Sequence, residues 1–340
     1  MTGNVWAPSV FVYDPTDYPL GWLEDQGVKV TLGVPIASPG RHRRKWDPEE
    51  LVAAAKGHEA LLGASGAIIS AEIMDALPEL RCIAKLGVGY EVIDIQAATQ
   101  RGILVATTPV HSEVGVVAEH ALALILGLCK QLHFYGPGYI AGGGWKDPRR
   151  MARDVAGSTI GIVGLGTIGR AVATRAAGLG ARILAYDVRR LDPAQGVEIV
   201  DLETLLRESD VVSLHVPGRR PGEGPLLGER ELQVMKSGAL LVNTARGNLV
   251  DKGQLVARLN DGRLGGYAAD VYLPEPPPPD DPILSAPNVI LTPHSAAWSL
   301  DVRRDMTQMA MENILAMLTG GAPESVVNPE AISRMRENRV

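Results

Sequence analysis

Cysteine is almost absent from this sequence. The 340 residues include two cysteines, Cys82 and Cys129, each inside an apolar segment. Two such residues provide neither a disulfide framework nor the close spacing of a metal site. We therefore expect no bound metal and a protein that functions in the reducing environment of the cytoplasm.

An excess of positive charge is also lacking. The formal net charge is -6 at pH 7, so the chain has no basic footprint of the kind that binds nucleic acid. One locally basic run, from Arg41 to Lys45, precedes the acidic residues that follow Asp47. We interpret this run as a solvated loop before a helix, with steering of anionic ligands as the alternative, and we expect no nucleic-acid partner.

Long uninterrupted apolar runs are missing too. The longest apolar helical segment, around residues 114–128, is interrupted by Glu119 and His120, which leaves too few residues to span a bilayer. The N-terminus has no charged-then-apolar signal pattern, and the C-terminus matches no sorting address. These absences predict a soluble, cytoplasmic protein that does not bind a membrane.

What the sequence does contain is a regular alternation of β-rich runs with helical patterns. The apolar runs include SVFVYD, VKVTLG, RCIAKLG and ILVATTP in the first third and TIGIVG, ARILAYD, VVSLHV, ALLVNTA and NVILTPH later. Strands that alternate with helices predict parallel sheets, and their apolar character indicates burial on both faces. We predict an α/β protein with two doubly wound parallel-sheet lobes.

The position of one glycine-rich motif predicts how these lobes are arranged in the chain. The motif GIVGLGTIGR begins only at Gly161, so a folded lobe must come before it. A later helical pattern over residues 299–319 is expected to return to that first lobe. We therefore predict a discontinuous substrate-binding domain of residues 1–109 and 296–340, flavodoxin-like, with residues 110–295 inserted as a Rossmann domain.

The motif has the context of a dinucleotide site. Gly164, Gly166 and Gly169 follow a predicted strand, and a predicted helix that includes Thr167 and Ile168 comes next. The glycines permit a tight turn, close approach of the backbone to a pyrophosphate and close packing of helix on strand. The helix N-terminus offers free N–H groups to phosphate. A purely structural turn is the alternative.

The strand ARILAYD ends in Asp187, roughly twenty residues beyond the glycines. A carboxylate at this place accepts a hydrogen bond from the ribose 2′-OH and repels a 2′-phosphate, which favours NAD over NADP. Arg189 and Arg190 follow at once. They either soften this preference or only flank the adenine.

Three polar residues follow predicted strands, at the edge where parallel sheets bind ligands. They are Arg246 in LLVNTARG, Glu275 after YAADVYLPE and His294 in ILTPHSAAW. Hydride transfer to a 2-oxoacid requires a cation that holds the carboxylate and a proton donor for the developing alkoxide. Arg246 suits the first task, and His294 suits the second with Glu275 to orient its ring.

At this point the sequence resembles the D-specific 2-hydroxyacid dehydrogenase family, which includes phosphoglycerate, glyoxylate/hydroxypyruvate and D-lactate dehydrogenases. The matching blocks run from about Leu80 to His294 and include KLGVGYEVID, GIVGLGTIGR, VVSLHVP, LLVNTARG, GGYAADV and ILTPHSA. The resemblance implies an NAD-dependent 2-oxoacid reductase with Arg246, Glu275 and His294 as catalytic residues. It also implies a homodimer that uses the helix from Glu113 and the Gly-rich arm after it.

The resemblance assigns further residues to binding. A backbone cradle for the substrate carboxylate falls on Leu86, Gly87, Val88 and Gly89, and Arg246 and His294 also contact substrate. Asp270 matches the residue that holds the nicotinamide carboxamide. The remaining residues implied to contact the cofactor follow predicted strands and are Val216, Pro217, Thr244, Ala245 and His294.

Departures from the family pattern narrow the substrate. Phosphoglycerate-type members carry arginines in a loop where this sequence has Ala64-Ser65-Gly66, which argues against a phosphorylated substrate. Formate-type members lack the partner of the histidine, so Glu275 argues against formate oxidation. Oxidation of a phosphonate or phosphite stays open as an alternative. A second alternative is an NAD(H)-sensing, corepressor-like binding protein, because such relatives keep the same three residues.

Overall fold

The computed structural model of this chain describes residues 7–14, 16, 18–33, 45–64, 66–189, 196–220 and 222–337. The basic residues 41–44, Ser65 and Arg190 lie outside the described residues. The chain divides into two compact units, Met1–Ser112 with Ser299–Val340 and Glu113–Trp298. The junctions predicted from the sequence lie three residues earlier at each crossing.

The first unit contains a five-stranded sheet in which every described pairing is parallel. Its spatial order is β2-β1-β3-β4-β5, which is the flavodoxin-like order. The strands are β1 (Ser9–Val12), β2 (Lys29–Leu32), β3 (Ala60–Gly63), β4 (Cys82–Lys85) and β5 (Leu104–Ala106). Strands β1, β3, β4 and β5 are buried along their whole length, as their apolar sequences predict.

The helices that cover this sheet come from the N-terminal and the C-terminal parts of the chain. They are α1 (Gly21–Asp25), α2 (Pro48–Ala55), α3 (Ala71–Ala76), α4 (Ile95–Gln100), α11 (Leu300–Thr319) and α12 (Ala331–Glu337). Helix α11 packs on β3, β4 and β5, so the segment after residue 299 returns to the first unit as the sequence predicts. A cluster that includes Phe11, Leu61 and Ile83 forms the core between α2, α3, α4 and the sheet.

The second unit contains a seven-stranded, fully parallel sheet of order β12-β11-β10-β9-β6-β7-β8. The strands are β6 (Thr159–Val163), β7 (Arg182–Tyr186), β8 (Val197–Ile199), β9 (Val211–Leu214), β10 (Ala239–Asn243), β11 (Leu264–Ala269) and β12 (Val289–Leu291). This is the Rossmann order with one additional edge strand. The predicted fold class, with one flavodoxin-like and one Rossmann sheet, is confirmed.

Two apolar cores lie on the two faces of this second sheet. Leu241 belongs to one core and its neighbours Leu240 and Val242 to the other, because successive strand residues point to opposite faces. The α-helices of this unit are α5 (His111–Cys129), α6 (Pro137–Ala141), α7 (Thr167–Gly178), α8 (Leu202–Glu208), α9 (Glu229–Val234) and α10 (Lys252–Asn260). Short 3-10 helices are η1 (Leu132–Phe134), η2 (Gly247–Leu249) and η3 (Pro282–Ser285).

Helix α5 corrects one argument made from the sequence. Its 19 residues are long and apolar enough to cross a membrane by length and composition, although Glu119 and His120 interrupt them. Burial is the better discriminator, because Ala121, Ile125 and Leu128 lie in the core beside β6 and β10. Such packing is typical of the core helix of a globular domain.

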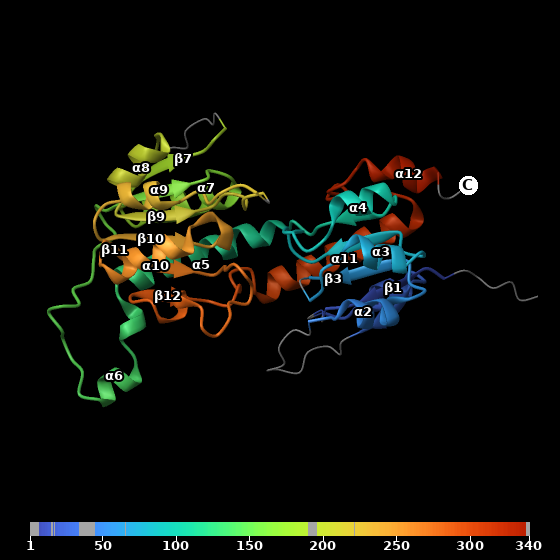
Figure 1. The fold of residues 1–340 in the computed structure, drawn as a ribbon, viewed down its shortest axis with the longest axis horizontal. Helices are drawn as coiled ribbons and strands as arrows, with labels where there is room; N and C mark the ends of the chain where they lie inside the picture. Colours follow the sequence, from blue (N-terminus) through green and yellow to red (C-terminus); the bar gives the residue numbers. More distant parts are fainter. Residues whose placement is uncertain are drawn as a thin grey trace, which may run out of the picture. The chain divides into compact units, whose positions relative to one another are not determined.

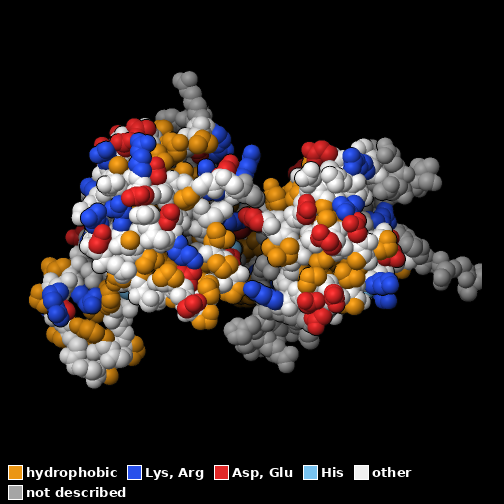
Figure 2. All heavy atoms as spheres, in the orientation of Figure 1, with side chains coloured by type: hydrophobic (Ala, Val, Ile, Leu, Met, Phe, Trp, Pro, Cys, Tyr) orange, Lys and Arg blue, Asp and Glu red, His pale blue; other side chains and the backbone are white. Residues whose placement is uncertain are grey.

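After α5 the chain forms an arm, which we define as residues 130–153. Figure 1 shows the arm, with α6 near its tip, projecting from the second unit before the chain enters β6. Figure 2 shows hydrophobic side chains on the surface of the arm. The exposed apolar residues of the arm include Ile140, Trp145 and Met151, which are 54%, 72% and 74% exposed. Exposed apolar side chains on one segment are a feature that interaction surfaces often have.

Candidate active site

The glycine motif forms the turn between β6 and α7. Gly164 has a φ of +96°, and a side chain there would place its Cβ 2.4 Å from the carbonyl oxygen of His215. A Cβ at Gly169 would lie 2.0 Å from the carbonyl oxygen of Gly164, so helix and turn touch directly. Gly166 precedes α7 and has open space where its Cβ would be. The first-turn amides of α7 therefore face an unobstructed approach, which suits a pyrophosphate.

Asp187 follows β7 and lies beside this turn. Its Oδ2 atom accepts a hydrogen bond from the amide of Leu165 at 2.9 Å, which ties the carboxylate to the glycine turn. Arg189 donates to the same carboxylate from its amide at 2.9 Å and from Nε and Nη2 at 3.1 Å each. The Arg189 hydrogen bond is the main cause that lowers the pKa of Asp187 to about 2. The carboxylate is therefore charged at neutral pH.

The other candidate cofactor residues follow β9 and β10. Strand β9 lies directly beside β6, and β10 lies one strand further, so the ends of both strands are close to this turn. Val216 and Pro217 come after β9, and Thr244 and Ala245 come after β10. The Oγ1 atom of Thr244 is buried without a hydrogen-bond partner among the described residues. An unsatisfied hydroxyl at this edge fits a site that a polar ligand completes. The residues present therefore fit a dinucleotide.

His294 and Glu275 form a close pair. His294 Nδ1 lies 2.6 Å from Glu275 Oε2, and Glu275 Oε1 accepts a hydrogen bond from the amide of Tyr272 at 2.9 Å. Burial favours a higher pKa for Glu275, but the hydrogen bonds from His294 and the Tyr272 amide and the charges of His294 and Arg246 together hold the pKa below its ordinary value. His294 has a φ of +53°, a left-handed backbone that is rare outside glycine and often marks functional sites.

Arg246 follows β10 in the same second unit. Its Nη1 atom donates to the carbonyl oxygen of Ala245 at 2.7 Å, and its own carbonyl oxygen accepts from Nδ2 of Asn243 at 2.9 Å. The Arg246 charge contributes to the lowered pKa of Glu275, so the two groups sense each other electrostatically. The structure thus brings Arg246, Glu275 and His294 to one edge of the second sheet, as the sequence predicts.

Sequence reasoning missed the part that Gly247 plays. A side chain at Gly247 would place its Cβ 2.1 Å from the carbonyl carbon of Tyr272 and 2.7 Å from the amide nitrogen of Leu273. The turn that carries Arg246 therefore lies directly against the backbone that leads to Glu275. The signal was present as the glycine after Arg246, but only the three-dimensional contact explains it.

Asp270 is almost completely buried and organises the segment around His294. Its Oδ1 atom accepts hydrogen bonds from Oγ1 of Thr292 at 2.6 Å and from the amide of Ser295 at 2.8 Å. Its Oδ2 atom accepts from the amide of Ala296 at 2.8 Å. His120 Nε2 lies 3.0 Å from Oγ1 of Thr292, so this helix histidine has a defined polar partner.

The candidate carboxylate cradle, Leu86 to Gly89, lies after β4 in the first unit. Two of its four amides are used within the fold, because Leu86 donates to the carbonyl oxygen of Gly63 and Gly87 to Oγ1 of Thr108. The amides of Val88 and Gly89 have no hydrogen-bond acceptor among the described residues. These two amides are therefore the ones left to bind an anion.

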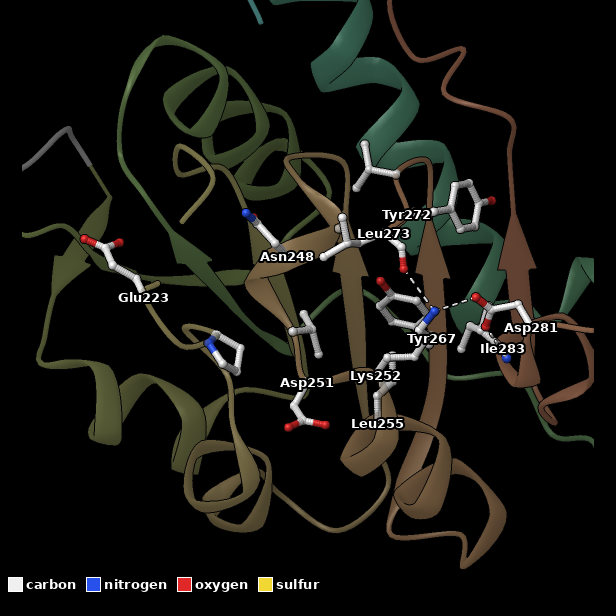
Figure 3. Close-up of a pocket in the computed structure, with 14 residues that line it drawn as sticks. Glu223, Asn248, Asp251, Lys252, Leu255, Tyr267, Tyr272, Leu273, Asp281 and Ile283 are labelled. Atoms are coloured by element: carbon white, nitrogen blue, oxygen red, sulfur yellow. Dashed lines mark hydrogen bonds and ion pairs between the residues drawn. The ribbon is translucent and has the colours of Figure 1, made fainter. Parts of the chain in front are cut away.

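A separate cavity of about 350 Å³ lies on the α10 side of the second sheet. Figure 3 shows Lys252, Tyr267, Leu273 and Asp281 among the side chains that line it. Gly247 and Tyr272 also line it, so the cavity borders the turn of Arg246 and the segment before Glu275. Within the described residues, no group of three or more His, Cys, Asp or Glu side chains is arranged to hold a metal ion.

Two glyoxylate reductases are among the known proteins that this chain resembles. A glyoxylate reductase of Korarchaeum cryptofilum is 45% identical over 272 residues, which cover 78% of this chain and 81% of that protein. A glyoxylate reductase of Thermofilum pendens is 39% identical over 299 residues, which cover 85% of this chain and 87% of that protein. The similarity therefore extends through most of both units.

The fold and a family model agree with these relatives. A crystal structure of a Thermus thermophilus protein superposes with a TM-score of 0.83 at 36% identity and covers 94% of this chain and 99% of that one. The model of the NAD binding domain of D-isomer specific 2-hydroxyacid dehydrogenases matches residues 122–296. The resemblance found in the sequence is confirmed: the chain belongs to the D-isomer specific 2-hydroxyacid dehydrogenase family and is an NAD-dependent oxidoreductase that acts on CH–OH groups.

Proposed function

We propose that this enzyme reduces a small, unphosphorylated 2-oxoacid of the glyoxylate class to the D-2-hydroxyacid. The observation that carries the proposal is the 2.6 Å contact between His294 and Glu275, because it pairs a proton donor with the carboxylate that orients it. Arg246, whose charge acts on Glu275, supplies the anion-binding cation. The similarity to two glyoxylate reductases supports the substrate class. Ala64 and Gly66, which leave no cation in their loop, support the absence of a phosphate.

The three side chains divide the chemistry among them. Arg246 binds the substrate carboxylate through its planar fork and polarises the adjacent carbonyl. His294 donates a proton from Nε2 to the carbonyl oxygen as negative charge develops there. Glu275 binds Nδ1 of the ring and stabilises its protonated form. NADH would supply the hydride when bound. Within the first unit, we assign the amides of Val88 and Gly89, which have no acceptor among the described residues, to anion binding.

We infer that NAD is preferred over NADP. Asp187 is charged and placed beside the glycine turn, where a ribose 2′-OH is accepted and a 2′-phosphate is repelled. Its pairing with Arg189 keeps that arginine engaged and away from an incoming phosphate. The residues assigned to the cofactor are the turn and strand-end positions Gly164, Gly166, Thr167, Ile168, Gly169, Asp187, Val216, Pro217, Thr244, Ala245, Asp270 and His294.

We also propose a cytoplasmic homodimer in which the first unit binds substrate and the second binds NAD. Helix α5 and the arm are the surface assigned to the dimer. The exposed apolar side chains of the arm support this assignment, because a second copy would remove them from water. The two buried, unpaired cysteines are compatible with a reducing compartment.

A substrate panel tests the proposal. The rate of NADH oxidation is measured with glyoxylate, hydroxypyruvate, pyruvate, phenylpyruvate, branched 2-oxoacids and phosphohydroxypyruvate, and the series is repeated with NADPH. We expect turnover of small unphosphorylated acids, with NADH preferred. Turnover of phosphohydroxypyruvate alone would contradict the substrate class. Tight NADH binding without turnover of any acid would favour a phosphonate or phosphite substrate, or the sensing role.

A further inference from the structure

The segment that carries Glu275 has few means of holding its own position. Between Leu273 and Asp281 lie five prolines, none of which has an N–H group to donate. Leu273 is 62% exposed, and most of the following residues are exposed as well. The proline-rich residues after Glu275 therefore contribute little packing and few backbone hydrogen bonds of their own to hold the loop.

One lysine from another element holds both ends of this segment. Lys252 is the first residue of α10, and its Nζ atom donates to the carbonyl oxygen of Leu273 at 3.0 Å. The same Nζ donates to Oδ2 of Asp281 at 2.5 Å. Figure 3 shows the two contacts diverging from Nζ at the side of the cavity. A single ammonium group thus bridges the residues on which the loop begins and ends.

The burial of Asp281 makes its ion pair with Lys252 hard to replace. The side chain of Asp281 is 2% exposed, whereas that of Lys252 is 40% exposed. A buried carboxylate requires a compensating charge, so the ion pair fixes Asp281 against α10. Asp281 also accepts a hydrogen bond from the amide of Ile283 through Oδ1, which anchors it to η3. Lys252 and the amide of Ile283 therefore both hold the far end of the loop.

The near end of the loop connects Lys252 to the catalytic pair. Leu273 lies two residues before Glu275, and the preceding amide, that of Tyr272, donates to Oε1 of Glu275. A shift of the Leu273 carbonyl would move this amide and with it the carboxylate that faces His294. Placement errors near 1 Å at reacting groups lower rates by roughly a hundredfold.

We propose that Lys252 is a positioning residue for catalysis, which holds the proline-rich loop so that Glu275 stays against His294. This inference rests on the proposed function of Glu275 and His294. Lys252 contacts neither substrate nor cofactor in this assignment. It acts through the carbonyl of Leu273 and the carboxylate of Asp281, so its removal should lower kcat while the binding of NADH is retained.

The test compares Lys252→Met with a matched control. Lys236 is 43% exposed and forms a 2.8 Å ion pair with Asp210, which also accepts a backbone amide, but it lies away from the candidate site. We expect Lys252→Met to lower kcat roughly tenfold or more with the KM for NADH within about twofold of wild type. Lys236→Met should leave both constants within about twofold. Lys252→Arg, which keeps a charged donor, should recover most of the lost kcat.

A double variant separates this proposal from the proposed function. If Lys252 acts through Glu275, then Lys252→Met should have almost no further effect on kcat in a Glu275→Gln background. An unchanged kcat in Glu275→Gln alone would overturn the catalytic assignment. If Glu275→Gln lowers kcat strongly, two results would overturn only the positioning role. One is an unchanged kcat in Lys252→Met. The other is an equal loss of kcat on adding Lys252→Met to the wild type and to the Glu275→Gln variant. Should Lys252→Met fail to fold, Asp281→Asn breaks the same ion pair, keeps an oxygen for Ile283, and must give the same kcat loss.

Discussion

At the scale of single residues, Asp187 is the side chain on which the proposed preference for NAD over NADP rests. Its carboxylate is held by the amide of Leu165 on one side and by Arg189 on the other. The same arginine that lowers the pKa of Asp187 is thereby kept from forming an anion site of its own. We propose that cofactor preference depends on this pair and not on the carboxylate alone.

The pair predicts the outcome of removing the carboxylate. Asp187→Ser should raise kcat/KM for NADPH relative to NADH by about tenfold or more, because repulsion is lost and Arg189 becomes available to the 2′-phosphate. Steady-state kinetics with both cofactors measure the ratio. The control is Asp187→Ser with Arg189→Ala, which should lose the gain for NADPH. An equal gain in both variants would show that Arg189 has no part in the preference.

His215, at the end of β9, gives a prediction for stability against pH. Burial lowers its pKa from 6.5 to about 4. Between these values the unfolded chain binds a proton that the folded chain does not, so the free energy of unfolding falls as pH decreases from about 6.5 to about 4. His215→Asn should remove a loss on the order of 1 to 3 kcal/mol over this range, as measured by urea unfolding at several pH values. An identical pH slope in wild type and variant would contradict this.

The residues that the sequence predicted share one property, and the contacts that it missed share another. Arg246, Glu275 and His294 each come after a strand that a local apolar run of sequence predicts. Because the ends of parallel strands lie at one edge of the sheet, the shared location of the three residues could also be predicted. The contacts of Asp270 with Thr292, Ser295 and Ala296 join residues more than twenty positions apart. No local pattern encodes such contacts, and they become visible only when β11 and β12 are placed side by side.

At the scale of elements, the turn of η2 and the loop that leads to Glu275 behave as one assembly. Gly247 makes the contact between them, since any Cβ there would overlap the backbone of Tyr272. The alternation of strands and helices could be predicted because each element has its own periodicity. The contact of Gly247 with Tyr272 could not be predicted, because it depends on how the ends of β10 and β11 lie beside each other in the folded sheet.

A glycine pair in this region tests the contact. Gly247→Ala should lower kcat and destabilise the second unit by a few kcal/mol, because the added methyl forces the turn away from Tyr272. The matched control is Gly253→Ala in α10, where the nearest atom to a new Cβ is 3.4 Å away and alanine favours the helix. Thermal unfolding and steady-state kinetics measure both effects. Equal behaviour of the two variants would refute the close contact.

At the scale of the whole molecule, the arm predicts an assembly. We expect the wild-type protein to sediment as a dimer at micromolar concentration. Ile140→Glu should shift it toward monomer, because a charge replaces an apolar side chain in the proposed interface. Leu179→Glu, at a 41% exposed position after α7, is the control and should leave the dimer intact. A wild-type protein that sediments as a monomer would contradict the proposed dimer.

We propose that His294 delivers the proton in the reduction of a 2-oxoacid. The most direct measurement is the steady-state rate of NADH oxidation by wild type and His294→Ala with glyoxylate as substrate. We predict that kcat falls by roughly 10² to 10⁴-fold in the variant while the KM for NADH changes less than about threefold, because the lost interaction forms only in the transition state. A variant that keeps the wild-type kcat would contradict the account.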